Sequence, residues 1–213
     1  MKVNINGTEY IYPTSLEQIT LGQRIDFYNA YEKGRVIPED ELDAIEERLS
    51  FAVKQFAFYT GASESEIKAH VSIKEMLDVI QSSATIMKEQ ELTMQVESEY
   101  LFKGELWCIA APETNATSTH TFNEFLSSKE IVRQMQQLGE GDFATLQYLC
   151  AIYLRKQGEP FSETFVSGER FALMRELPLS IALAVAFFLS SSMNTFQSTL
   201  LSLKPEQEAA GLT

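Results

Sequence analysis

The first dozen residues alternate between apolar and polar side chains on either side of Asn6-Gly7. This pattern predicts a β-hairpin, because Asn and Gly tolerate the positive φ angles that a two-residue type I′ turn requires. Val3 and Ile5 share one face of the first strand, and Pro13 ends the second strand.

The period of two returns in residues 94–111, "MQVESEYLFKGELWCIAA". Lys103-Gly104 lies between two alternating segments and predicts the turn of a second hairpin. Pro112 follows the second segment and ends it. The chain therefore contains two predicted hairpins, each turned at a glycine and each ending near a proline.

Between the hairpins, apolar residues recur every three or four positions, which predicts helices. Ser63 with Glu66, and Ser72 with Glu75, form capping boxes that mark two helix starts. A glycine, Gly61, closes the long helix before them. The predicted core faces of the three main helices are Leu21, Ile25, Tyr28 and Tyr31; Leu42, Ile45, Leu49, Ala52, Val53 and Phe56; and Ile73, Met76, Leu77, Ile80, Ala84 and Met87.

From Thr121 onward the helical period continues. Thr121 and Glu124 form a third capping box, and Pro178 suits the first turn of the last helix. A short helix is predicted just before Pro178. The apolar stripes of the two earlier helices are Phe122, Phe125, Leu126, Met135 and Leu138, followed by Phe143, Leu146, Leu149, Cys150, Tyr153 and Leu154.

We therefore predict a mainly α fold, a bundle-like helical domain with two β-hairpins. Because an isolated hairpin is marginally stable, we expect the two hairpins to pair into one small antiparallel sheet. The polar loop 112–120 separates residues 1–111 from a helical half at 121–203, and residues 204–213 form a tail. The two halves could also form one integrated domain.

The segment 177–203 carries no charged residue. Ile181 to Leu189 is apolar on all sides, but a membrane span needs about 20 predominantly apolar residues. Beyond Leu189, the residues Met193, Phe196 and Leu200 continue a single amphipathic face. We interpret the segment as a core helix whose second half covers a neighbour. That neighbour is either this chain or a partner protein, and a membrane span is the disfavoured alternative.

The formal net charge is -13, with Lys and Arg scattered singly. Such a surface repels nucleic-acid phosphates and anionic membranes, so we expect neither as a partner. Glu39, Asp40 and Asp43 belong to the acidic start of the second predicted helix. These carboxylates are either a solvated helix face or a binding face for a basic partner. The first ten residues lack the apolar core of a signal peptide, so we expect a cytoplasmic protein.

Candidate catalytic chemistry is sparse. Gly139, Gly141 and Ala144 match G-x-G-x-x-A, but a helical pattern rather than a strand precedes them, so no cofactor is expected. His70 and His120 are not in a metal-ligand spacing, and no metal site is expected. Cys108 and Cys150 lie in apolar runs and suit buried free thiols. We expect no enzyme, the alternative being a site assembled in space from dispersed carboxylates or the two histidines.

Several phrases suggest a family: "VNINGTEYIYPTSLEQITLGQRIDFYNAY" at the start, then "KGELWCIAAPE", "THTFNEF", "LQYLCAIYLRKQGEPFSE" and "ERFALMRELPLSIALAVAFFL". In this order the chain resembles small acidic helical proteins from the structural modules of tailed bacteriophages, especially tail assembly chaperones. The resemblance implies a non-enzymatic assembly factor in the host cytoplasm. It would bind an aggregation-prone phage protein, such as the tape measure, while the tail tube forms. A structural virion protein, in the tail or at the head–tail junction, is the second function that the resemblance allows.

Overall fold

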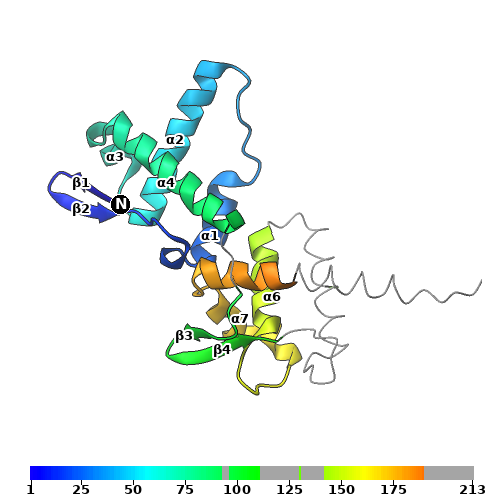
Figure 1. The fold of residues 1–213 in the computed structure, drawn as a ribbon. Coiled ribbons are helices and arrows are strands. Elements are labelled where there is room, and N and C mark those ends of the chain that lie inside the picture. The colour runs from blue at the N-terminus through cyan, green and yellow to red at the C-terminus, as the bar shows by residue number, and fades with distance from the viewer. Residues whose placement is uncertain (93–95, 111–129, 131–141, 190–213) are drawn as a thin grey trace, which may run out of the picture.

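The computed structural model describes residues 1–92, 96–110, 130 and 142–189 (Figure 1). The fold is mainly α with two small antiparallel sheets, as the sequence predicts. In Figure 1 the first hairpin lies beside α3 and α4, and the second lies with α6 and α7 in the other half of the molecule. α1 lies where these two halves meet.

The first hairpin forms as predicted, from β1 (Lys2–Ile5) and β2 (Thr8–Ile11). The turn residues Asn6 and Gly7 have φ angles of 51° and 85°, which explains the choice of residues there. The strands pair antiparallel from Lys2–Ile11 to Ile5–Thr8. The inner face of β1 is buried and its outer face is polar, which fixes the register.

The helices of this half begin and end at residues with a clear local role. They are α1 (Leu21–Phe27), α2 (Glu41–Thr60), α3 (Glu64–His70) and α4 (Ile73–Leu92), with a 3-10 turn η1 (Leu16–Gln18) before α1 and a π-turn η2 (Tyr28–Glu32) after it. Gly61 ends α2 with a φ of 77°. Both predicted capping boxes before α3 and α4 are present. A further box, Thr20 with Gln23, caps α1.

The second hairpin consists of β3 (Tyr100–Phe102) and β4 (Glu105–Ile109). The expectation that the two hairpins pair with each other is wrong, because they belong to separate sheets. The third strand of the second sheet is β5 (Leu154–Lys156), which pairs antiparallel with β4. β5 follows directly on α6 (Asp142–Tyr153), so the helical stripe predicted to include Leu154 ends one residue earlier. β5 therefore supplies the additional strand that stabilises this hairpin, a role that the sequence analysis assigned to the first hairpin.

The remaining regular elements of the described chain are helical. It comprises a 3-10 turn η3 (Glu163–Val166), α7 (Gly168–Met174) and a helix over 179–189 that begins just after Pro178, as predicted. No helix in the described ranges is long and apolar enough to cross a membrane. Of the segment Ile181 to Leu189, which was interpreted as core, the residues Ile181 to Val185 are buried, but Phe187 is 49% exposed.

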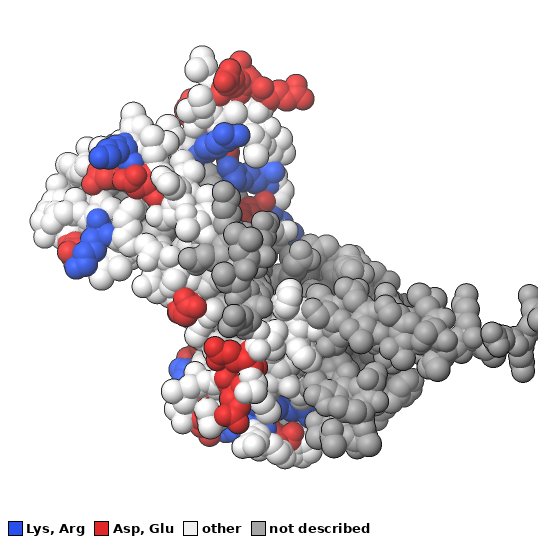
Figure 2. Space-filling view, viewed as in Figure 1, with Lys and Arg blue, Asp and Glu red and all other residues white. Residues whose placement is uncertain are grey.

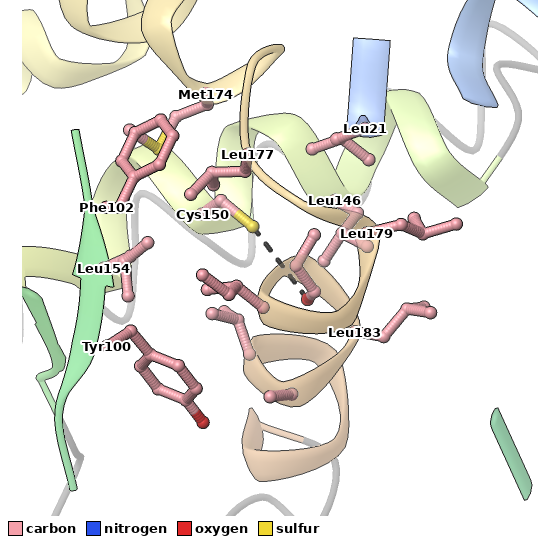
Figure 3. Packing of buried hydrophobic residues seen from close by; sticks show 14 of the residues in the cluster. Leu21, Tyr100, Phe102, Leu146, Cys150, Leu154, Met174, Leu177, Leu179 and Leu183 are labelled. Carbon is pink, nitrogen blue, oxygen red and sulfur yellow. Dashed lines mark hydrogen bonds between the residues drawn. The ribbon is translucent and has the colours of Figure 1, made fainter. Parts of the chain in front are cut away.

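Two clusters of buried side chains hold the molecule together. The small core lies between the first hairpin and α2, α3 and α4, with Val3, Ile5, Tyr12 and Phe56 among its members. The large core joins residues of α1, the second sheet, α6, α7 and the 179–189 helix (Figure 3). Cys150 lies fully buried in it, and burial raises the pKa of its thiol, so it behaves as an apolar side chain. Both cysteines are free, as predicted, but only Cys150 is fully buried, since Cys108 is partly exposed.

Backbone hydrogen bonds join residues 19–22, at the start of α1, to residues 175–179, between α7 and the 179–189 helix. The amides of Leu21 and Gly22 donate to the carbonyls of Leu177 (2.8 Å) and Arg175 (2.7 Å). The Leu179 amide donates in return to the Ile19 carbonyl at 2.8 Å. α1 therefore enters the large core through backbone hydrogen bonds as well as through side-chain packing.

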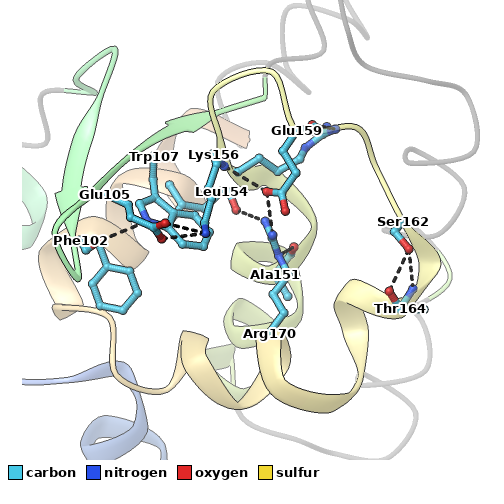
Figure 4. Close-up of polar contacts among 11 residues, drawn as sticks. Phe102, Glu105, Trp107, Ala151, Leu154, Lys156, Glu159, Ser162, Thr164 and Arg170 are labelled. Atoms are coloured by element: carbon cyan, nitrogen blue, oxygen red, sulfur yellow. Dashed lines mark hydrogen bonds and ion pairs between the residues drawn. The ribbon is translucent and has the colours of Figure 1, made fainter.

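Arg170 ties α6, β5 and α7 together (Figure 4). Its guanidinium donates to the carbonyls of Ala151 (3.0 Å) and Leu154 (2.6 Å) and to the Glu159 carboxylate (2.8 Å). Burial raises the pKa of Glu159, but the hydrogen bonds from Arg170 and from the Lys156 amide, together with the positive charges of these two residues, outweigh burial and hold that pKa below its ordinary value. Each of the three guanidinium nitrogens of Arg170 thus donates a hydrogen bond within the fold, which marks this residue as structural.

Candidate functional site

The sequence proposed two binding faces, and the structure describes one of them. Met193, Phe196 and Leu200 lie outside the described residues. Glu39, Asp40 and Asp43 lie exposed at the start of α2. Figure 2 shows acidic side chains gathered over this end of α2, away from the bulk of the molecule.

Asp40 has a structural role that the sequence analysis did not assign to it. Its carboxylate accepts hydrogen bonds from the amides of Leu42 (2.9 Å) and Asp43 (3.1 Å), and so caps α2. The neighbouring carboxylates of Glu41 and Asp43 lie in the first helical turn, where the helix dipole favours negative charge. The acidic cluster therefore stabilises the helix start as well as giving it a negative potential.

Beside this acidic end, α2, α3 and the start of α4 enclose a depression of about 460 Å³, which we call the apolar groove. Its apolar lining includes Leu42, Ile45, Leu49, Val71, Ile73 and Met76. Glu46 and Lys68 contribute charged groups to its wall. The floor is firm, since Val53, Ile67 and Met76 are buried in the small core.

The apolar groove corrects the predicted core face of α2. Leu42 and Ile45 were expected to be buried, but they are 76% and 48% exposed, and on α4 Ile73 is 69% exposed. Leu77, also predicted as core, is 53% exposed. The reason is geometric: burial on α2 begins only in the second half of the helix, with Ala52, Val53 and Phe56. The periodicity correctly identifies the apolar face of α2, but it does not show whether another element covers that face.

The loop before α2 holds the helix from another side. Arg35 donates two hydrogen bonds to the Glu47 carboxylate, at 2.7 and 2.5 Å, and its guanidinium lies 3.6 Å from the centroid of the Phe51 ring. These hydrogen bonds lower the pKa of Glu47. The exposed first half of α2 is therefore anchored in one orientation, which gives the apolar groove a defined shape.

The remaining residues singled out by the sequence do not assemble a reaction centre in the described structure. His70 is exposed at the end of α3, and Ala144 lies within α6. His120, Gly139 and Gly141 lie outside the described residues. Within the described ranges, no group of three or more His, Cys, Asp or Glu side chains is placed to hold a metal ion.

Comparison with known proteins adds no relative: the chain matches no protein-family model, no curated protein and no solved structure. The features that bear on function are therefore the apolar groove, the charge distribution and the resemblance carried by the sequence phrases.

Proposed function

We propose that this protein is a non-enzymatic assembly factor that binds an amphipathic helix of another protein in the apolar groove. The observation that carries the proposal is the exposure of Leu42, Ile45 and Ile73 side by side in one concave surface. Large apolar side chains grouped in this way mark protein-interaction sites in soluble proteins. An amphipathic helix fits a groove between helices through apolar residues spaced three, four and seven positions apart.

Charge narrows the class of partner. The groove opens beside the acidic start of α2, and the whole chain carries a formal charge of -13. A partner helix with Lys or Arg next to its apolar face gains electrostatic attraction there, whereas an acidic helix is repelled. Glu39 and Asp43 supply this selectivity, and Leu42 supplies apolar contact.

The resemblance to phage tail assembly chaperones supplies a biological setting. On this proposal the partner is an aggregation-prone phage protein such as the tape measure, whose apolar helices need cover before assembly. The second function that we propose to test is a structural virion protein of the tail or head–tail junction. Protein copy number in purified particles distinguishes them, because a chaperone is absent from the particle and a component is present in fixed copies.

The binding test uses the full chain and a fluorescein-labelled helical peptide with leucines along one face and lysines at both ends. We expect the double variant Leu42→Lys, Ile73→Lys to lose at least about tenfold in affinity, since burying one such side chain contributes about 1.5–3 kcal/mol. The matched control is Leu101→Lys on β3, where the side chain is 71% exposed and far from the groove in sequence and in Figure 1.

Both variants replace exposed side chains, so the free energy of unfolding should change by less than about 0.5 kcal/mol for each substitution. A scrambled peptide of the same composition tests whether charge alone causes binding. Equal affinity of wild type and the groove double variant, or equal binding of the scrambled peptide, would refute the proposed site.

A further inference from the structure

A second cavity, the junction cleft, lies where α1, α2 and α4 approach Leu179 of the 179–189 helix. Its volume is about 340 Å³, which falls in the range of small-ligand pockets, about 300–1,000 Å³. The cleft is distinct from the apolar groove, because the two cavities have no lining residue in common. We propose that it binds a carboxylate carried on an apolar or aromatic group.

The charges that line the cleft are unusual for so acidic a chain. Arg24, Arg35 and Arg48 line it together with one carboxylate, Glu32. A second carboxylate, Glu47, pairs with Arg35. Three guanidinium groups against two carboxylates leave one positive charge in excess. A monoanion neutralises this excess, whereas a dianion such as a phosphate monoester leaves a negative charge in a partly desolvated site.

Arg24 provides a donor that has no acceptor. One of its terminal nitrogens donates to Glu32 at 2.8 Å, and its guanidinium lies 4.4 Å from the centroid of the Phe143 ring. The side chain is only 11% exposed, and the other terminal nitrogen, Nη1, is buried without a hydrogen-bond partner. A buried unpaired group on a charged side chain is costly, so its presence calls for an explanation. A carboxylate oxygen that enters beside Arg24 supplies the missing acceptor.

Tyr59 provides a second donor. Its hydroxyl makes no hydrogen bond within the part of the chain that the structure describes, although the residue lines the cleft. Burial raises the pKa of Tyr59, and nearby Arg24 only partly offsets this, so the hydroxyl stays protonated and can donate. Tyr12, by contrast, is already bonded to Ser83 at 2.7 Å. Tyr59 is thus the tyrosine available to a ligand.

The rest of the cleft suits the apolar part of such a ligand. The rings of Phe27 and Tyr59 lie 5.5 Å apart, and those of Phe27 and Phe51 also lie 5.5 Å apart, so three packed aromatic rings form part of the cleft wall. An apolar or aromatic group packs against this wall while its carboxylate reaches Arg24 and Tyr59. The same chemistry is presented by a free organic acid and by the terminal carboxylate of a protein that ends in an aromatic residue.

Calorimetric titration of the full chain with 4-phenylbutyrate tests the site. We expect binding of the acid and at least about tenfold weaker binding of 4-phenylbutanamide, which lacks the charge. Tyr59→Phe should lower the affinity for 4-phenylbutyrate by about tenfold, because a hydrogen bond to a charged group is lost. Arg48→Gln, at an exposed position, should also lower the affinity for 4-phenylbutyrate and make that affinity less dependent on salt concentration. The matched control Tyr148→Phe, on α6 and outside the cleft, should bind as the wild type does.

Tyr59→Phe removes no hydrogen bond of the described structure, so its urea unfolding midpoint should equal that of the wild type. A short peptide ending in phenylalanine, compared with its amide, distinguishes the two sources: a stronger preference for the peptide acid indicates a chain terminus, and a preference for 4-phenylbutyrate indicates a free acid. The proposal is overturned if neither acid binds better than its amide at millimolar concentration, or if Tyr59→Phe binds as the wild type. The groove double variant Leu42→Lys, Ile73→Lys should keep the wild-type affinity for the acid. The test of the junction cleft is therefore independent of the peptide-binding test of the proposed function.

Discussion

Gly22 lies in α1, where replacing glycine with alanine would ordinarily help. Alanine in a helix interior is favoured over glycine by about 0.5–1 kcal/mol, chiefly because glycine loses more backbone freedom on folding. Here a Cβ atom would lie 2.8 Å from the Arg175 carbonyl oxygen and 2.9 Å from the Arg175 Cβ. The first of these atoms belongs to the backbone, so α1 and the 175–179 segment must separate. We therefore predict that Gly22→Ala destabilises the protein.

The magnitude follows from two costs that oppose the helix preference. Forcing an extra carbon into a packed contact costs about 1–3 kcal/mol. Separation also stretches the hydrogen bond from the Gly22 amide to the Arg175 carbonyl, now 2.7 Å, and a buried amide left unpaired costs about 1–3 kcal/mol. After the helix preference is subtracted, we expect the free energy of unfolding to fall by about 2 kcal/mol or more.

Urea unfolding followed by far-ultraviolet circular dichroism measures this change. The matched controls are Gln81→Gly and Gln81→Ala, at an exposed position of α4, where alanine should be the more stable of the two by the ordinary helix preference. The expected result is a reversal of sign between the two sites. A Gly22→Ala variant as stable as the wild type would refute this prediction, because it would show that the backbone near Arg175 can move away from the added Cβ without loss of stability.

Three further predictions concern polar contacts. Arg170→Met should lower the free energy of unfolding by about 3 kcal/mol, because it removes the hydrogen bonds to the Glu159 carboxylate and to two backbone carbonyls. In the same urea titration Lys103→Met, which breaks a half-exposed pair with Glu176, should change that free energy by less than about 1 kcal/mol. Glu159→Gln should be less stable than wild type at pH 7; since folding lowers the pKa of Glu159, that difference should shrink as the pH falls below the ordinary value of 4.5, and a constant difference from pH 7 to acid would contradict this. Ser72→Ala should cost about 1 kcal/mol through loss of the α4 cap, and an unchanged urea midpoint would contradict it.

Local signals in the sequence predicted local structure well. The turn at Asn6-Gly7, the end of α2 at Gly61 and the cap at Ser72 each depend on a few neighbouring residues, and each is confirmed. The third strand was missed because Leu154 continues a helical stripe of apolar residues, and only its distant partner β4 shows that the backbone becomes extended. Pairing between segments about fifty residues apart leaves no periodic trace in either segment.

The candidate site was predictable in part for a similar reason. The acidic start of α2 is visible in the sequence as Glu39, Asp40 and Asp43, and it does lie exposed beside the groove. The groove itself was predicted as core, because periodicity identifies an apolar face without revealing whether another element covers Leu42 or Ile73. The junction cleft left no signal at all, since its lining comes from scattered residues between Tyr12 and Ile86 and from Leu179.

The contact between residues 19–22 and 175–179 has a consequence for synthesis of the protein. Every buried residue of the small core lies between Val3 and Val79, so this core can form while the second half of the chain is still being translated. The large core needs Leu21 and Ile25 together with residues from Leu146 to Val185. Closing a chain of this length is slow compared with local helix formation. α1 therefore emerges early from the ribosome, but its apolar face must wait, uncovered, for most of the polypeptide to follow.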